Sequence, residues 1–323
     1  MKILIIRLSS LGDIVLTQPV PAILRRQFPD AQIDYITKNV YTEAVEAFGC
    51  IDHIFVYKTK DLFLELRKGK YDMVIDLHSK LNTFIIKTIV GGKKTVTYDK
   101  KPFLRRKMVK GKSKQQIEST VGLYFSALKK IGLDEKYSNP ELYPKSGKSK
   151  LPVELKSSDK VVGIFPGALH QTKRYPLKQL AEVINILPEE YNFVIFGSKD
   201  EMKDSAELNS LAKREVTDLC GTLSIAELIA TMNDLDLVIS NDSGPMHIAA
   251  ALQKNQIALF GATHPILGFS PMNINATVIC KNISCQPCSL HGSERCPKGH
   301  FDCMNKIKPI EIAEESQKIL SEL

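Results

Sequence analysis

The sequence lacks a run of apolar residues long enough to cross a bilayer as a helix. Its first residues, MKILIIRLSSLGD, also lack the features of a secretory signal. The apolar stretch is short, Arg7 interrupts it, and no small-residue cleavage site follows. We therefore expect a cytoplasmic protein whose N-terminal residues form a buried strand.

Two common nucleotide-binding fingerprints are missing as well. No GxGxxG follows the first expected strand, which disfavours an oxidoreductase that binds NAD or FAD. No GxxxxGK followed by Ser or Thr occurs, so the chain is not a P-loop protein. A nucleotide site in this sequence would need other phosphate-binding loops.

Length and charge narrow the classes that remain. The 323 residues, 43% of them hydrophobic, are too many for one typical core and suit two domains. A formal net charge of +8 favours an anionic partner: nucleic acid, phospholipid headgroups or a phosphorylated substrate. Excess lysine is also common in ordinary soluble proteins. We find no nucleic-acid recognition module and expect no nucleic-acid partner.

Short apolar runs alternate with helical segments in both halves of the chain. This pattern predicts parallel sheets with helices on both faces, an α/β fold with two doubly wound, Rossmann-like domains. We expect domains at 1–150 and 151–323, joined by a polar linker near 134–158, with the last helix free to pack back on the first domain. The expected strands are residues 2–8, 32–37, 53–57, 72–78 and 94–98, then 160–165, 192–197, 236–240 and 256–260.

The turn SSLGD at 9–13 joins the first expected strand to the first helix. In doubly wound sheets, ligands bind at the carboxyl ends of the strands, where Asp13 would lie. Asp13 could equally serve only as a helix cap. The pattern alone leaves both roles open.

Two later loops have the features of anion sites. In PGALHQTKRYP, residues 166–176, Gly167 and the following amides could form a nest, and Lys173 and Arg174 precede a helix. In NDSGPMHIAAAL, residues 241–252, a helix begins directly after a strand, so its first amides would point at a phosphate. A solvated basic loop, a capping Asp242 and a structural His247 are the alternatives.

Four cysteines crowd into one late segment, at positions 285, 288, 296 and 303. Cys285, Cys288, Cys296 and Cys303 could hold a structural zinc or iron ion, with His291 and His300 nearby as alternative ligands. The later spacings do not match a standard zinc ribbon. Reduced thiols in a surface loop are the competing interpretation.

Taken together, three segments resemble glycosyltransferase family 9, the ADP-heptose:lipopolysaccharide heptosyltransferases. They are KILIIRLSSLGDIVLTQPVPAIL, FPGALHQTKRYP and NDSGPMHIAAALQKNQIALFGATHP, in the family's order. The resemblance implies a GT-B fold, in which two Rossmann-like domains face a central cleft. The first would take the acceptor and the second the nucleotide sugar.

The resemblance also implies roles for single residues. Asp13 matches the general base and Lys173 the lysine on the donor diphosphate. Glu201 falls where the family places a carboxylate on the ribose, and Leu223 where members line the adenine pocket. The donor-binding residues implied or expected are Gly167, Lys173, Arg174, Glu201, Leu223, Asp242, Ser243, Gly244, Pro245, Met246 and His247.

The function implied is inverting transfer of heptose from ADP-heptose to the inner core of lipopolysaccharide. Asp13 would deprotonate the acceptor hydroxyl, and Lys173 with the helix-start amides would stabilise the departing ADP without a catalytic metal cofactor. The acceptor would be an acidic glycolipid, met by peripheral contact with the inner membrane face. A UDP- or GDP-sugar donor, and a non-catalytic nucleotide-binding protein of this fold, are the alternatives.

The basic stretch at 93–114 gives a first testable prediction. It holds ten cations against one acid, Asp99, and would attract an acidic acceptor. Neutralising Arg105, Arg106 and Lys107 should raise the acceptor KM more than the donor KM in steady-state kinetics. Equal kinetics in the two proteins would contradict this role.

Overall fold

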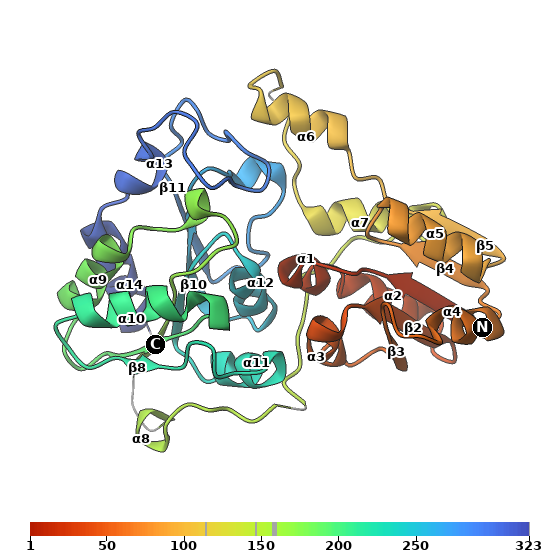
Figure 1. The fold of residues 1–323 in the computed structure, drawn as a ribbon, viewed down its shortest axis with the longest axis horizontal. Helices are drawn as coiled ribbons and strands as arrows, with labels where there is room; N and C mark the ends of the chain where they lie inside the picture. Colours follow the sequence, from red (N-terminus) through yellow and green to blue (C-terminus); the bar gives the residue numbers. More distant parts are fainter. Residues whose placement is uncertain (114, 146, 157–159, 323) are drawn as a thin grey trace. The chain divides into compact units, whose positions relative to one another are not determined.

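The computed structural model describes residues 1–113, 115–145, 147–156 and 160–322. The chain divides into two compact units, which are shown in Figure 1. The first comprises Met1–Lys101 and Ser119–Ser146, and the second comprises Pro102–Glu118 and Gly147–Leu323. Among the described residues, no helix combines the length and the apolarity that crossing a bilayer would need.

The first unit is built on a five-stranded parallel sheet in the order β3-β2-β1-β4-β5. The predicted alternation of strands and helices is therefore confirmed in this half. The strands are β1 (Lys2–Ile6), β2 (Gln32–Thr37), β3 (His53–Val56), β4 (Met73–Asp76) and β5 (Lys94–Thr97). The helices are α1 (Leu11–Val15), α2 (Pro19–Gln27), η1 (Asn39–Tyr41), α3 (Thr42–Glu46), α4 (Leu62–Lys68), α5 (Leu81–Val90) and α7 (Thr120–Lys129).

Alternate side chains of β1 serve the two faces of this sheet, as the pleat of a strand requires. Leu4 and Ile6 join the core cluster that includes Leu62 and Leu66 of α4 and Ile86 of α5. On the other face, Tyr35 packs edge-on against Phe48 and its hydroxyl lies 2.8 Å from that of Thr17. Helices α4 and α5 thus cover one face side by side.

The second unit holds a six-stranded parallel sheet in the order β11-β10-β9-β6-β7-β8. The strands are β6 (Val161–Phe165), β7 (Asn192–Ile195), β8 (Thr217–Asp218), β9 (Leu237–Asn241), β10 (Asn255–Phe260) and β11 (Ala276–Cys280). The helices are α6 (Pro102–Val109), α8 (Val153–Lys156), η2 (Gln171–Lys173), α9 (Leu177–Ile186), η3 (Lys199–Glu201), α10 (Met202–Leu211), α11 (Ile225–Asn233), α12 (Gly244–Ala251), η4 (Pro265–Leu267), α13 (Asp302–Asn305) and α14 (Pro309–Ser321).

The last helix, α14, packs within the second unit. Ile312, Ala313 and Leu320 are buried in the same cluster as Leu180 and Ile184 of α9. That it could also pack back on the first domain stays a prediction. Its buried apolar side chains pack against α9 and the sheet of its own unit.

Residues 102–118 were placed in the first domain by the sequence, but their contacts belong to the second unit. The Ile117 amide donates to the Ile266 carbonyl at 2.9 Å. The Arg105 side chain is 3% exposed, donates to the Leu267 carbonyl at 3.3 Å and lies over the Phe269 ring. Arg105 is thus a structural cation and not part of a flexible basic segment, whereas Arg106 and Lys107 are exposed. Lys114 lies outside the described residues.

Candidate functional site

The two loops predicted to bind anions leave neighbouring strands of the second unit. β6 pairs with β9, so the segments that follow Phe165 and Asn241 emerge at the same edge of the sheet. Asn241 joins them directly. Its side-chain amide donates to the Pro166 carbonyl at 2.7 Å, and its side-chain oxygen accepts the Tyr175 amide at 3.0 Å. The ends of the 166–176 loop are therefore fixed to the end of β9.

A buried ion pair completes this corner. Lys173 Nζ lies 2.8 Å from an Asp242 carboxylate oxygen, and the Thr263 hydroxyl donates to the same oxygen at 2.6 Å. The two charged side chains are only 15% and 6% exposed. The negative charge of Asp242 is thus committed to holding Lys173 in place. Asp242 positions the lysine and is poorly suited to contact a phosphate itself.

Helix α12 begins in the same corner, with Ser243 at its N-cap and Pro245 in its first turn. The Ser243 hydroxyl is buried, makes no cap bond, and has no hydrogen-bond partner among the described residues. The free amides of a helix start and an unused hydroxyl favour an anion there. Met246 instead packs with Ala258 and Phe260 in the core, and His247 is buried in the first turn.

Glu201 lies at the carboxyl ends of β6 and β7, directly over Gly167. A Cβ added at Gly167 would lie 1.8 Å from Glu201 Oε1, so only glycine fits beneath this carboxylate. The Ser198 amide and hydroxyl donate to Glu201 Oε2 at 2.7 and 3.0 Å. The carboxylate is therefore fixed beside the 166–176 loop. Leu223 is half-buried just before α11.

The Arg174 side chain makes its contacts with Ala168 and Asp204 of the same unit. Its guanidinium donates to the Ala168 carbonyl at 2.7 Å and to Asp204 at 2.6 Å. With Asp204 it lines a cavity of about 640 Å³ between the 166–177 and 294–301 segments. Arg174 therefore shapes the loop that carries Lys173, with its Nε and Nη1 groups engaged there.

The four cysteines do not form the predicted metal site. No three His, Cys, Asp or Glu side chains within the described part of the chain are arranged to hold a metal ion, and all seven thiols are free. Cys303 is 4% exposed and belongs to the apolar core. Burial, and then the charges of Cys288, Cys285 and Cys296, raise the pKa of its thiol to about 12. Cys285 Sγ instead lies 3.9 Å from His300 Nε2.

The cysteine-rich segment supports the lysine loop. Thr172 and Ser293 share four hydrogen bonds. The Thr172 amide and hydroxyl donate to the Ser293 carbonyl at 3.0 and 2.9 Å, the Ser293 amide donates to the Thr172 hydroxyl at 2.8 Å, and the two hydroxyls lie 3.3 Å apart. Gly292 (φ +95°) leaves room for the Lys173 stem, because a Cβ there would lie 3.0 Å from it. This segment therefore packs against Lys173 and is bonded to the residue before it.

In the first unit, Asp13 is the centre of a separate polar group. Arg7 Nη2 lies 2.7 Å from Asp13 Oδ2, which also accepts the Ser10 hydroxyl at 2.8 Å. The Tyr124 hydroxyl donates to Oδ1 at 3.3 Å. The side chain of Asp13 is 25% exposed and that of Arg7 only 7%. Asp13 therefore does cap α1, as one alternative held, yet its carboxylate still reaches solvent in a fixed orientation.

Arg7 and His78 are the residues that sequence reasoning missed. Arg7 donates to the Leu77 carbonyl at 2.6 Å and so ties β1 to the end of β4. A cation at the end of an otherwise apolar strand must find partners when the strand is buried, and this was the available signal. His78 follows Leu77 and is 4% exposed.

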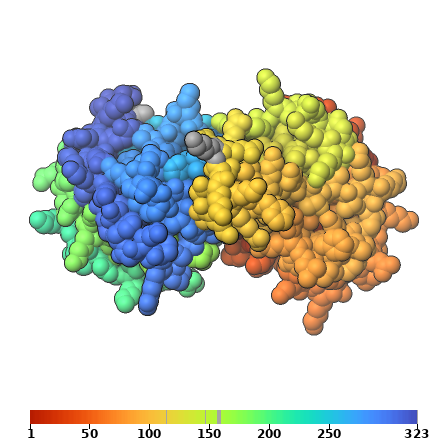
Figure 2. Space-filling model, turned by 90° about the horizontal axis from the view of Figure 1, so that it is seen from above, coloured from red at the N-terminus to blue at the C-terminus, as the bar shows by residue number. Residues whose placement is uncertain are grey.

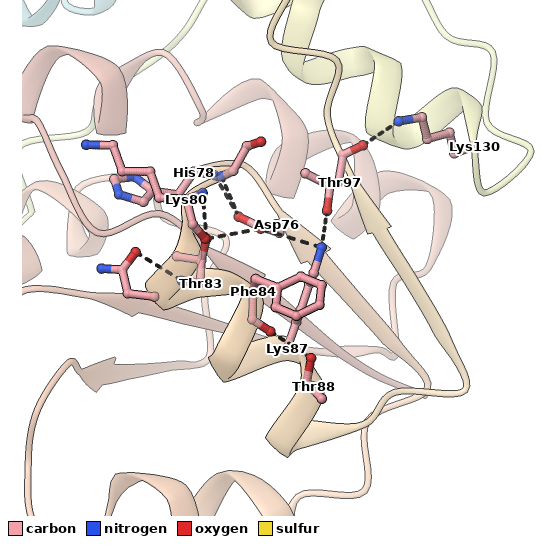
Figure 3. Close-up of polar contacts among 11 residues, drawn as sticks. Asp76, His78, Lys80, Thr83, Phe84, Lys87, Thr88, Thr97 and Lys130 are labelled. Carbon is pink, nitrogen blue, oxygen red and sulfur yellow. Dashed lines mark hydrogen bonds and ion pairs between the residues drawn. The ribbon is translucent and has the colours of Figure 1, made fainter.

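Asp76, at the end of β4, holds the His78 segment in place (Figure 3). Its Oδ1 accepts the amides of His78 and Ser79, both at 2.9 Å. Its Oδ2 accepts the Thr83 hydroxyl at 3.1 Å and lies 3.9 Å from Lys87 Nζ. Lys87 in turn donates to the Thr97 hydroxyl at 2.6 Å. The inner face of α5 is thus attached to β4 and β5 by polar contacts.

The comparison that decides the family covers most of the chain. The sequence pattern of glycosyltransferase family 9 (heptosyltransferase) matches residues 60–297. The chain belongs to this family. As a family 9 chain it is a glycosyltransferase, which confirms the enzyme class that the sequence predicted.

Named relatives of this family 9 enzyme agree. It is 27% identical to lipooligosaccharide heptosyltransferase 2 of Campylobacter jejuni, over 99% of this chain and 98% of the relative. Among solved structures, Escherichia coli ADP-heptose lps heptosyltransferase II superposes with a TM-score of 0.78 at 21% identity, over 100% and 99% of the two chains. A family 9 glycosyltransferase from Veillonella parvula gives 0.80 at 20% identity, over 100% and 98%. The GT-B fold is therefore confirmed.

His78 gives this family 9 enzyme a prediction about pH. Burial, and then the cations Arg7, Lys80 and Lys100, lower the pKa of its imidazole from 6.5 to about 3. On acidification the unfolded chain takes up a proton that the folded chain refuses, so stability is lost as pH falls below 6.5. Between pH 7 and pH 5 the wild type should lose ~2 kcal/mol more free energy of unfolding than His78→Gln. Urea denaturation at the two pH values measures this, and parallel losses would contradict it.

Proposed function

We propose that this family 9 enzyme transfers heptose from ADP-heptose to the acidic inner core of lipopolysaccharide, with inversion at the anomeric carbon. The observation that carries the proposal is the corner of the second unit where Lys173, held by Asp242, lies beside the start of α12. A fixed ammonium group and free helix-start amides suit a diphosphate leaving group. The names of the relatives supply the identity of the sugar and nucleotide.

On the donor side, the charge that ADP gains as the bond breaks is taken up by Lys173 and the amides after Ser243. The buried Ser243 hydroxyl, which uses none of its donor capacity within the described residues, adds a further bond to phosphate. Glu201 accepts from the ribose hydroxyls, since its carboxylate is fixed at the same edge of the sheet. Leu223 lies against the adenine. Arg174 and Asp242 contribute by positioning Lys173.

On the acceptor side, Asp13 removes the proton from the attacking hydroxyl. Its three partners, Arg7, Ser10 and Tyr124, fix the carboxylate while leaving it partly exposed to an incoming sugar. A single base and attack opposite the leaving group give inversion, unlike the two close carboxylates of a retaining glycosidase. The acceptor is lipid-linked, so the enzyme works in the cytoplasm in peripheral contact with the inner membrane face. The net charge of +8 supports an anionic partner there.

The test is turnover of ADP-heptose by wild type and Asp13→Asn. Loss of the base should lower kcat by about 10²–10⁴-fold, while ADP still raises the melting temperature of both proteins. Ser10→Ala serves as the matched control, because it removes one hydrogen bond to Asp13 and keeps the carboxylate. Its kcat should fall far less.

Other outcomes would replace the proposal. Equal kcat values for wild type and Asp13→Asn would remove Asp13 as the base. Stabilisation by UDP or GDP in place of ADP would indicate another donor sugar. Stabilisation by ADP with no transfer by the wild type to any inner-core acceptor would indicate a nucleotide-binding protein without this activity.

A further inference from the structure

Helix α5 exposes apolar side chains on the face where a surface helix normally carries polar ones. Its outward positions follow helical spacing: Leu81, Phe84, Ile85, Thr88 and Ile89. The four apolar side chains are 76%, 56%, 48% and 37% exposed, in that order. The opposite, inner face of α5 is buried and consists of Thr83, Ile86 and Val90. The helix is therefore apolar on the side that faces the core and on the side that faces water.

The neighbouring helix extends this surface. In α4, Leu62 and Leu66 are buried in the core cluster, while Phe63 and Leu64 are 38% and 57% exposed. α4 contacts α5, and both helices cover the same face of the sheet. Their outward side chains thus form one surface, which we call the α4–α5 face, defined by Phe63, Leu64, Leu81, Phe84, Ile85 and Ile89. In Figure 2 the orange atoms of this part of the chain lie at the surface.

The segments that carry and flank the α4–α5 face are rich in cations. Between residues 58 and 94 there are nine, Lys58, Lys60, Arg67, Lys68, Lys70, Lys80, Lys87, Lys93 and Lys94, against four acids, Asp61, Glu65, Asp72 and Asp76. Two of these acids are already paired, Asp72 with Lys93 and Asp76 with Lys87. Lys87 Nζ also lies 5.3 Å from the centre of the Phe84 ring. The partner of such a surface must be apolar within and anionic at its border.

We propose that the α4–α5 face docks this enzyme on an anionic phospholipid bilayer. Short helices with large apolar side chains outward and a cationic border bind in the plane of the headgroups. The bonds from Thr83 to Asp76 and from Lys87 to Thr97 hold α5 on the sheet, so its outer face is presented as a firm surface (Figure 3). This proposal rests on the proposed function, because it takes from it that the acceptor is linked to a membrane lipid.

The sequence contains no tryptophan, so a single introduced one reports on one place in the molecule. Phe84→Trp puts the reporter on the α4–α5 face, and Val40→Trp puts it at a 62% exposed position of the same unit, on η1. Vesicles of phosphatidylglycerol and phosphatidylethanolamine should shift the emission of Phe84→Trp to the blue. Lipids brominated on their acyl chains should quench it. Val40→Trp should show neither effect.

Binding of the full chain gives the second measurement. In vesicle sedimentation, Phe84→Ser/Ile85→Ser should lower the partition coefficient at least ~10-fold, because two large apolar side chains are removed from the lipid. Val40→Ser/Ile274→Ser removes two other exposed apolar side chains and should bind as the wild type does. Arg67→Gln/Lys68→Gln should weaken binding and reduce its dependence on salt.

Three results would overturn the proposal: no emission shift for Phe84→Trp, equal binding to vesicles of phosphatidylcholine alone, or a blue shift that follows protein concentration without vesicles. The last would assign the face to a second copy of the chain. The proposed function fails separately. If vesicles bind through this face but the wild type does not use ADP-heptose, membrane docking is supported and the proposed heptose transfer is wrong. If heptose is transferred to a soluble, deacylated acceptor but vesicles do not bind, the reverse holds.

Discussion

The ion pair between Lys173 and Asp242 is the interaction on which the donor corner depends. Removing two charges from water costs several kcal/mol per ion, and the pair recovers this only with good geometry and further hydrogen bonds. Here the distance is 2.8 Å, and Thr263 adds a bond to the same carboxylate. Asn241 fixes the loop on one side of Lys173, and the Thr172–Ser293 bonds fix it on the other. The Lys173 side chain is therefore preorganised in the absence of a ligand.

The two units use the same principle in different ways. In each, a parallel sheet brings the ends of adjacent strands to one edge, and the loops there carry the chemistry. The second unit offers cationic groups and helix-start amides, which suit a leaving phosphate. The first offers a partly exposed carboxylate that a buried arginine holds in place. The two sheet edges thus differ in the charge that they present to a ligand.

Nine of the strands and several helices were predictable because their apolar periodicity is strong. Gln32–Thr37 was predicted to the residue. β8 and β11 were missed, because one has two residues and the other is only half-buried. Lys173 and Asp242 were found from their loop sequences and Glu201 through a resemblance, and their roles as donor contacts stay predictions. That Asp242 binds the lysine could not be read from spacing, since it depends on the pairing of β6 with β9.

The errors arose where a charged or reactive residue type was interpreted apart from its packing. Arg105 was counted among solvent-exposed cations, yet it lies against Phe269 in the second unit. Cys303 was counted as a metal ligand, yet as part of α13 its side chain is buried in the apolar core. Arg7 was noted only as a break in an apolar run, although it holds Asp13. In each case the role of the side chain depends on its burial. The burial of such residues is hard to predict from a single sequence.

We expect Lys173 and its corner to bind a nucleoside diphosphate. Calorimetric titration of ADP into wild type and Lys173→Met/Asp242→Asn tests it most directly, because the double change leaves no unpaired buried charge. Lys178→Met, an exposed lysine on α9, is the control. ADP should bind the double variant at least ~10-fold more weakly and the control as it binds the wild type. Equal ADP affinity in all three proteins would contradict it.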